Sequence, residues 1–570
     1  MPMHDGCAPN TMVSLFVLHA AAVAAAAVAA GPPFYVLDPA AFAPLLGSDH
    51  AWAVGPAGPP LFEASDANLT TAYIFRFRVL KSHIHNNTGT DDPGLQYVIT
   101  EFSPNVPWAG RANTIPCAAG HHLTDARWLR STAVAESYSR WWVSGLQGVR
   151  PNYYSFWATA VRRRLQVEGA AALPLISVLL PNASAMLDLF GNGTHPPGSA
   201  FSANHDCMFN VPGNEGQERT ISGPGCRPLV QALLFGEADA LSELCAAAGD
   251  AACASRWAAA AAQWRARVLV LWNPALASFD TLRLRNASDP GGAFSGVREL
   301  GSLSSPWFFG AVPPDAAAAY GPGWAAAFDP QGFLGPFGLR TAEARHPEYK
   351  CPLPGCSGGC YWSGPVWPFE TSKLLRAGVD VLQSPLLAPA VPQLSRAGWW
   401  QLMGQYTAMH AAGVWKITNY TKAAPNATAD PAALARDGFL LDGLGAAWVG
   451  ELGCAEDGAW TDDPAKGFLY EHSTYADLVL SGVAGLAPAA WAPGRPAPPP
   501  SLTVAPLQPA DGALAWWCAD GVRVGGRVVT VLWDADGSRY GRGAGLRVLV
   551  DGVQQAAAAT TQGPPLVVAL

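Results

Sequence analysis

Residues Cys360–Ser372 read CYWSGPVWPFETS, and a Lys-Leu-Leu run follows directly. Trp362 and Trp367 stand five residues apart, among glycine and proline residues that fix the course of the backbone. The stretch therefore predicts a rigid aromatic surface that leads into a helix at 367–382. Aromatic faces suit the apolar face of a sugar ring, and a few fixed polar groups can hold its hydroxyls. The alternative is that both tryptophans fill a core at a loop-to-helix junction.

The composition of the chain limits its class. Its 570 residues predict two or three units, one of them large. Half of the residues are hydrophobic, with 22 Trp and 22 Phe, so a sizeable core is available. Only 14% are charged and the formal net charge is -8, with no basic patch in view. We therefore expect no nucleic-acid partner, because phosphate binding needs clustered Lys and Arg.

The N-terminal stretch Met12–Ala30 is apolar and ends in small residues. It predicts a secretory signal within residues 1–30, with a cleavage option at Ala27-Val28-Ala29, while a membrane anchor is the alternative. No other long apolar span suggests a transmembrane helix, so we expect no membrane span in the mature chain. A secreted or lumenal location is also favoured by the Asn-x-Ser/Thr sequons at Asn68, Asn86, Asn182, Asn192, Asn286, Asn419 and Asn426.

The cysteines fit an oxidising compartment. Removal of the leader takes Cys7 and leaves ten, an even number that permits disulfides whose pairing cannot be read from sequence. The cluster Cys351, Cys356 and Cys360 invites a zinc interpretation, which the spacing disfavours because it gives no paired CxxC and no His follows at ligand distance. We expect no metal and no cofactor.

The middle of the chain reads as helix after helix, and the fold class predicted is mainly α. A helix is expected over Leu69–His85 and a short strand over Gln96–Phe102. Long loops are expected at 191–225 and 275–365. Further helices are predicted at 123–144, 153–168, 172–190, 226–248, 252–270, 367–382, 391–413, 431–440 and 473–486.

The last part of the chain changes to a period of two. A Pro-rich hinge at 487–505 precedes apolar or alternating runs at 522–524, 527–533 and 546–550, with Asp-Gly and Gly-Gly turn signals between them. This pattern predicts a small C-terminal β domain. The predicted organisation is a signal segment at 1–30, a helical domain at 31–486, the linker at 487–505 and a β domain at 506–570.

Two carboxylate-bearing stretches could support acid–base chemistry. Glu215 lies in a Gly-rich loop that enters a helix, and partial burial there would raise its pKa toward that of a general acid. Glu451 is wedged between glycine and hydrophobic residues, where a carboxylate is rare unless paired or used. Glycoside hydrolysis needs two such groups. The plainer interpretation of Glu215 and Glu218 is a solvated pair on a surface loop.

Other chemistries lack their motifs. The sequence has no G-x-S-x-G elbow, phosphate loop, G-x-G-x-x-G after a strand or H-E-x-x-H. His121 and His122 are adjacent, so at most one of them faces any given site, and a sugar-hydroxyl or structural role is favoured over metal binding.

Ordered blocks along the chain resemble a known family, the mannosylglycerate-hydrolase-like glycosidase domain related to glycoside hydrolase family 63. The resemblance runs from roughly residue 60 to 555. The blocks that carry it are Trp108–Ile115, Cys117–His122, Tyr154–Trp157, Ile221–Gly223 with Arg227-Pro228, Trp362–Phe369, Tyr470–Leu478, Thr530–Asp534 and Arg539–Leu546.

The resemblance implies an (α/α)6 barrel, or six-hairpin toroid, with a small C-terminal β domain. It implies Glu215 as general acid and Glu451 as general base. Relatives usually show Asp-Gly-Met-Glu where this chain has Glu215-Gly216-Gln217-Glu218, and they tend to have Asn where Glu471 stands. The sugar-binding wall it implies consists of Trp108, His121, His122, Arg227, Trp362, Trp367, Glu218, Glu471 and His472.

Three functions follow from these patterns. The first is a secreted inverting glycoside hydrolase acting on an α-linked oligosaccharide or glycoside. The second is a catalytically inactive carbohydrate-binding or cell-wall glycoprotein, which the departures at Glu215 and Glu471 favour. The third is a polysaccharide lyase on the same type of barrel, which would need a Tyr or His base.

Overall fold

The structure is a computed structural model of the chain. It describes residues 33–87, 91–102, 106, 109–145, 153–191, 200–201, 207–286, 288–336, 338–350, 361–423, 470–489 and 500–570. The predicted leader at 1–30, the predicted helix at 431–440 and the cysteines Cys351, Cys356 and Cys360 lie outside these ranges.

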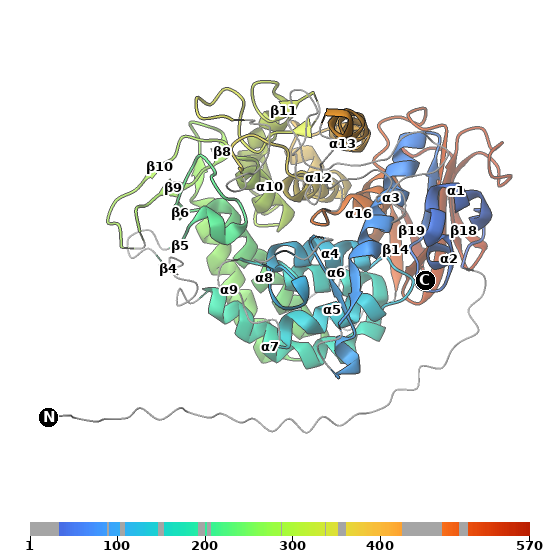
Figure 1. Cartoon of the computed structure of the whole chain (residues 1–570), viewed down its shortest axis with the longest axis horizontal. Helices are drawn as coiled ribbons and strands as arrows, with labels where there is room; N and C mark the ends of the chain where they lie inside the picture. Colours follow the sequence, from blue (N-terminus) through green and yellow to red (C-terminus); the bar gives the residue numbers. More distant parts are fainter. Residues whose placement is uncertain are drawn as a thin grey trace.

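Within the described residues, six helices form a closed inner ring, each packed against the next and the last against the first. Figure 1 shows them around the middle of the helical body. Their side chains are almost all buried, which explains why these segments are so rich in apolar residues. In ring order they are α4 (Ala119–Ala126), α6 (Trp157–Glu168), α8 (Pro228–Ala247), α10 (Leu300–Phe308), α12 (Pro368–Gln383) and α16 (Tyr475–Leu478).

Other helices pack outside the ring and return the chain between its members. They are α3 (Ala67–His83), α5 (Ala133–Val143), α7 (Leu173–Gly191), α9 (Ala251–Leu269) and α13 (Arg396–Ala423). Local sequence sets several of their boundaries. Both α8 and α12 begin with a proline, whose missing N–H costs nothing at a first helical position. The Asp66 carboxylate accepts from Asn68 N and caps α3.

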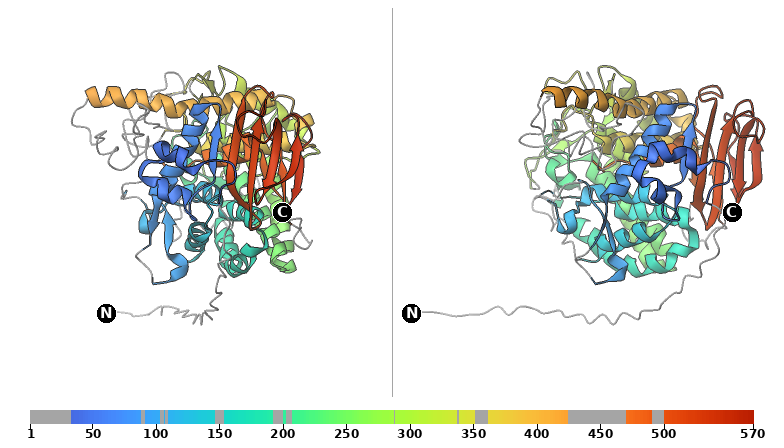
Figure 2. Two further views of the ribbon diagram at one scale, coloured as in Figure 1. Left: turned by 90° about the vertical axis from the view of Figure 1, so that its right-hand side faces the viewer. Right: turned by 45° about the vertical axis from the view of Figure 1, so that its right-hand side comes forward.

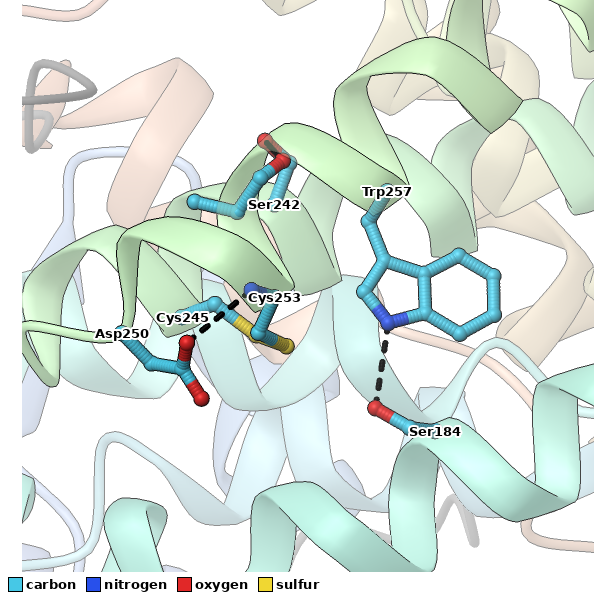
Figure 3. Close-up of a disulfide and its surroundings, with 7 residues drawn as sticks. Ser184, Ser242, Cys245, Asp250, Cys253 and Trp257 are labelled. Atoms are coloured by element: carbon cyan, nitrogen blue, oxygen red, sulfur yellow. Dashed lines mark hydrogen bonds between the residues drawn. A yellow bond between two sulfur atoms is a disulfide. The ribbon is translucent and has the colours of Figure 1, made fainter.

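A disulfide joins the two helices of the α8–α9 hairpin (Figure 3). It links Cys245 near the end of α8 to Cys253 in the first turn of α9. The Asp250 carboxylate caps α9 by accepting from Cys253 N at 2.9 Å. One turn further on, Trp257 Nε1 donates to Ser184 Oγ of α7 at 3.0 Å. These contacts fix the hairpin against the neighbouring outer helix.

The C-terminal part is a β unit on one side of the helical body, drawn in red in Figure 2. Its larger sheet is antiparallel, with strand order β1-β15-β16-β17-β18. A smaller sheet has the order β13-β14-β19. The strands are β1 (Leu61–Ala64), β13 (Leu486–Pro488), β14 (Ser501–Val504), β15 (Trp516–Val524), β16 (Arg527–Asp534), β17 (Gly545–Val550), β18 (Val553–Ala558) and β19 (Leu566–Ala569).

The predicted strands at 522–524, 527–533 and 546–550 are confirmed as parts of β15, β16 and β17. Gly525 and Gly526 both have positive φ at the β15–β16 turn, the conformation that a two-residue hairpin requires. The first strand of the larger sheet comes from the N-terminal part of the chain, because β1 pairs with β15. Asp520 of β15 also accepts from the backbone N–H of Tyr35, Val36 and Leu37.

Several helix predictions needed correction. The single helix expected at 123–144 is two, α4 and α5, separated by a turn at 127–132. In this turn the Arg130 guanidinium donates to the carbonyls of Ala53, Gly55 and Pro59. The loop expected at 275–365 contains α10. The helix expected at 473–486 is α16, followed by a π-helical turn at Val479–Val483 and then β13.

Among the described residues, one run, Trp157–Phe190, is long and apolar enough to cross a bilayer by length and composition. It comprises α6 and α7, and both helices pack against α8 in the body. Of the most apolar window of this run, 39% is buried within the body.

Candidate active site

The starting ends of the ring helices meet at one end of the barrel. Arg227 immediately precedes α8 and lies 3.7 Å from Glu299, which precedes α10. Trp367 precedes α12, and its ring lies 5.8 Å from that of His472, which precedes α16. Helix starts carry partial positive charge and unpaired N–H groups, so this end of the barrel favours carboxylates.

Glu215 lies at this end, at the last position of a short 3-10 turn, η7 (Pro212–Glu215). The chain then reverses at Gly216, whose φ of 68° is left-handed. The loop is held on both sides by strands β5 (Met208–Asn210) and β6 (Gly225–Cys226), which pair with each other. The disulfide Cys207–Cys226 clamps the same two strands. The position of the Glu215 carboxyl is thus set by a covalently closed loop.

The two carboxyl oxygens of Glu215 have different surroundings. Oε1 accepts from Arg227 Nε at 2.5 Å and from Asn210 Nδ2 at 2.8 Å. Oε2 is buried and has no hydrogen-bond partner within the described residues. Burial raises the pKa of Glu215, and the Arg227 charge opposes that rise. A carboxyl with one oxygen held by donors and the other unengaged can carry its proton on the second oxygen.

Arg227 ties this loop to the neighbouring ring helix. Its Nη1 donates to Ser222 Oγ and to the Gly223 carbonyl, both at 2.7 Å. Glu299, at the start of α10, accepts from Ser222 N at 2.8 Å and from Ser222 Oγ at 2.7 Å. The two carboxylates around one buried guanidinium keep the Arg227 pKa above its ordinary value. Arg227 is therefore a permanent cation next to Glu215.

The paired tryptophans are stacked on each other. Their ring centroids are 4.4 Å apart and their planes differ by 9°. Both are almost fully buried, and Trp367 Nε1 donates to the Tyr361 carbonyl at 2.7 Å. They belong to a small aromatic cluster that is separate from the main core and contains Phe102, Ile115, Cys117, Trp362, Trp367, Phe369 and Tyr470. The two tryptophans are therefore buried in a small core of their own, and this core lies at the end of the barrel where the ring helices start.

His121 and His472 face this aromatic cluster. The His121 ring makes edge contacts with Phe156 and Phe369, at centroid distances of 4.9 and 4.5 Å. Neither of its ring nitrogens has a hydrogen-bond partner among the described residues, and burial lowers its pKa well below the ordinary value. His472 lies 5.7 Å from Phe369, with its Nδ1 3.3 Å from Glu101 Oε1. His121 is thus a buried, neutral imidazole whose two nitrogens make no hydrogen bond within the described residues.

His122 and Glu471 are engaged in contacts between helices. His122 Nδ1 lies 3.0 Å from Tyr138 Oη, and its Nε2 contacts the Glu471 carbonyl. The pKa of His122 is lowered to about 3, chiefly by burial. The Glu471 carboxylate accepts from Arg76 Nη2 at 2.8 Å. Both ring nitrogens of His122 are occupied, so this residue links α4 to the start of α16.

Glu218 is the more accessible carboxylate of the loop. It is half-buried, and its Oε1 accepts from Tyr153 Oη at 3.4 Å. Its carbonyl accepts from Trp362 N at 3.1 Å, which joins the loop to the aromatic cluster. The next residue, Arg219, has a left-handed φ of 60° and places its guanidinium 4.5 Å from the Tyr361 ring. Strained backbone of this kind is often found at functional sites.

The structure brings further polar residues to this end that the sequence did not single out. Glu370 and Lys373, in the first turns of α12, form a fully buried ion pair with 2.7 Å between Nζ and Oε1. Glu101 and Glu299 are also buried there. A signal was present, since Glu370 follows Trp-Pro-Phe in an otherwise apolar helix start, where an unpaired carboxylate would be costly.

Trp108 and Glu451 lie outside the described residues. Within the described ranges, no group of three or more His, Cys, Asp and Glu side chains is placed to hold a metal ion. A cavity of about 450 Å³ lies beside the aromatic cluster and shares Val106 with it. Its lining includes His85, Thr100 and Arg111.

Comparison with solved structures finds proteins to which this chain is similar. A sialidase matches with 25% identity and a TM-score of 0.75, covering 94% of this chain and 45% of its own length. The chain thus spans less than half of that protein. A GH78 family rhamnosidase of Bacillus SP. GL1 matches with 13% identity and a TM-score of 0.49, covering 85% and 41% of the two chains. A GH63 mannosylglycerate hydrolase from Thermus thermophilus matches with 11% identity and a TM-score of 0.47, covering 72% and 100%.

No curated protein sequence matches the chain. The profile of the mannosylglycerate hydrolase MGH1-like glycoside hydrolase domain matches residues 111–426, more than half of the chain. The predicted fold class, a mainly α (α/α)6 barrel with a small C-terminal β domain, is confirmed. The chain belongs to the MGH1-like glycoside hydrolase domain family.

Proposed function

We propose that this protein is a secreted, inverting glycoside hydrolase that acts on an α-linked oligosaccharide or glycoside. The observation that carries the proposal is the grouping of Glu215, Glu218 and the stacked Trp362–Trp367 pair at one end of a ring of helices. The family relation supports the glycosidase class. Because the chain spans less than half of the matched sialidase, its substrate is argued from its own site.

The general acid comes from the loop Glu215–Glu218. Burial raises the pKa of Glu215, and its unengaged Oε2 is the atom that would carry the proton to the leaving oxygen. Glu218 is the second carboxyl of the same loop and is closer to solvent. Glu451 would act as general base. Inversion requires carboxyl groups about 6.5–9.5 Å apart, which leaves room for the attacking water.

The sugar would be held by aromatic faces and by buried polar atoms. Trp108, Trp362 and Trp367 would supply the apolar wall. The free nitrogens of His121 and the indole N–H of Trp362, which has no partner among the described residues, would meet hydroxyls. Arg227 and His472 would complete the polar side, while His122 and Glu471 would support it from between the helices. Secretion is supported by the disulfides Cys207–Cys226 and Cys245–Cys253 of the described residues.

The test is a screen of the full chain on α-linked manno- and gluco-oligosaccharides, with Glu215→Gln, Glu218→Gln and Glu451→Gln beside the parent. Proton NMR of the first product formed reports its anomeric configuration. We expect a β-configured product from an α-linked substrate, and a fall in kcat of at least about 100-fold in Glu451→Gln and in one of the two loop variants. Turnover that survives all three changes would refute the mechanism, and a retained configuration would refute inversion.

A second function is favoured by one observation. The Glu215 side chain is fully buried against Arg227, so a sugar can reach its Oε2 only if covering atoms move. A catalytically inactive carbohydrate-binding or cell-wall glycoprotein would keep the aromatic cluster without needing that access. Binding of the same oligosaccharides by the parent protein without turnover would establish this alternative.

A further inference from the structure

Gln217 stands between Glu215 and Glu218 in the loop that carries both carboxylates, and its side chain reaches the ring helix α12. The residue is buried, with 2% of its surface exposed. Its Nε2 donates to Glu370 Oε1 at 2.7 Å. Glu370 lies on α12, more than 150 residues away in sequence, so this hydrogen bond connects the loop to the barrel wall.

Glu370 is fixed by donors from three separate elements. Its Oε1 accepts from Gln217 of the loop and from Lys373 Nζ of α12, each at 2.7 Å. Its Oε2 accepts from Ser304 Oγ of α10. Lys373 Nζ is itself fixed, since it also donates to Ser305 Oγ at 3.0 Å and lies 4.8 Å from the Phe369 ring centre. A fully buried carboxylate with this many donors has one available position.

The amide of Gln217 has equally little freedom. A Cβ atom placed on Gly301 of α10 would come within 2.7 Å of Gln217 Nε2 and 3.0 Å of its Oε1. The helix therefore packs directly against the amide, and any side chain at position 301 would displace it. The absence of a side chain at Gly301 lets Gln217 reach Glu370.

We propose that Glu370, acting through Gln217, is a positioning residue that sets the placement of the Glu215 and Glu218 carboxyl groups relative to the sugar. The inference rests on the proposed glycosidase function. Gln217 is one residue from Glu218 and two from Glu215, so a backbone shift at Gln217 would be passed on to both carboxyl-bearing residues. Misplacement of a reacting group by about 1 Å can cost about 100-fold in rate.

The test variant is Gln217→Met, which keeps the size of the side chain, removes the link and leaves the Glu370–Lys373 pair intact. Its control is Gln508→Met in the β unit. Gln508 is also fully buried, and its side chain is hydrogen-bonded to the Ala510 and Asp511 carbonyls and to Trp517 Nε1. The control therefore removes buried polar contacts of a glutamine that lies in the β unit and not in the loop.

We expect Gln217→Met to lower kcat on an α-linked mannobiose or maltose by about 10- to 100-fold, with KM within about threefold of the parent. Gln508→Met should lose thermal stability and keep the parent kcat. Hydrogen exchange gives a readout that does not depend on turnover, and we expect faster exchange at residues 216–222 in Gln217→Met only.

The kinetic and exchange results together separate the positioning role of Glu370 from the proposed glycosidase function. If kcat and the exchange of residues 216–222 are both unchanged in Gln217→Met, or changed equally in Gln508→Met, the positioning role is refuted. If the parent protein has no turnover but exchange rises only in Gln217→Met, the proposed function fails while the fixing of the loop by Glu370 stands. A variant that unfolds is replaced by Gln217→Leu, judged by the same exchange criterion.

Discussion

Asp477 closes the ring of helices, and its replacement by asparagine should destabilise the fold strongly. The residue lies on α16 and is fully buried. Its Oδ1 accepts from Arg127 Nη2 at 2.5 Å and from Trp128 Nε1 at 2.8 Å, both just beyond α4. Its Oδ2 lies 3.4 Å from Arg376 Nη1 of α12. One carboxylate thus joins the last ring helix to both of its neighbours.

The size of the effect can be bounded from two sides. The arginines hold the pKa of Asp477 at about 2, against an ordinary value of 3.8, in spite of the burial that opposes this shift. That difference corresponds to about 2 kcal/mol of stability at neutral pH. Asp477→Asn also leaves buried guanidinium groups without their counter-charge, which typically costs about 3–5 kcal/mol. We therefore expect a loss of about 2–5 kcal/mol.

The pH dependence has a definite sign. Because the folded-state pKa lies below the unfolded one, the stabilisation is complete above about pH 4 and is lost as the pH falls through about 2. The assay is urea unfolding followed by tryptophan fluorescence at neutral pH. Asp380→Asn is the matched control, since Asp380 also pairs with Arg376, at 2.7 Å, but its side chain is 38% exposed.

The control should lose under about 1 kcal/mol, because exposed ion pairs contribute little. Equal losses in Asp477→Asn and Asp380→Asn would show that closure of the ring does not depend on this carboxylate.

Three further predictions concern other buried groups. Replacing Cys207 and Cys226 by serine should cost about 3 kcal/mol of stability and lower sugar binding, whereas the same change at Cys245 and Cys253 should cost a similar amount and leave binding intact. Titration of tryptophan fluorescence with the sugar measures binding in both variants. Equal binding in the two would contradict a role for the Cys207–Cys226 bridge in holding the Glu215 loop. The Cys117 thiol is buried and its pKa is raised, so iodoacetamide at pH 8 should label it in urea and not in the native protein. Peptide mass spectrometry measures the labelling, and equal labelling in both conditions would contradict the burial of this thiol. Burial raises the pKa of Glu237 to about 7, so the folded state holds this proton more tightly than the unfolded state does. The group therefore lowers stability by up to about 3 kcal/mol as the pH rises from about 4.5 to 7. Glu237→Gln should flatten that part of the plot of stability against pH, and an unchanged slope would refute the assignment.

The sequence predicted those parts of the fold that depend on local signals. The Trp-Pro-Phe stretch placed the start of α12 within a residue, because a proline at the first helical position and the apolar period after it are both local. The Gly525-Gly526 turn likewise marked the β15–β16 hairpin. In contrast, α10 has Gly, Ser and Pro in its sequence, Leu-Gly-Ser-Leu-Ser-Ser-Pro-Trp-Phe, and owes its helical form to packing between α8 and α12.

The sequence predicted individual residues of the candidate site but not the contacts between them. Glu215 and Arg227 were both singled out, yet their contact depends on a loop closed by the bridge between Cys207 and Cys226, and disulfide pairing cannot be read from spacing. The contact of Gln217 with Glu370 joins segments more than 150 residues apart, and no local pattern reports such a pair. Predicted contacts of Trp108 and Glu451 remain predictions.

The pairing of β1 with β15 limits when the larger sheet can form during synthesis of the chain. Ala64 is opposite Trp517, so a strand made early must wait for a partner made some 450 residues later. At ribosomal rates of about 5–20 residues per second, that interval is about 20–90 seconds. During this time the apolar side chains of Leu61 and Phe62, fully buried in the finished protein, lack their neighbouring strand. A nascent chain stopped before residue 516 therefore carries the β1 segment as an unpaired apolar strand that chaperones or other chains can bind.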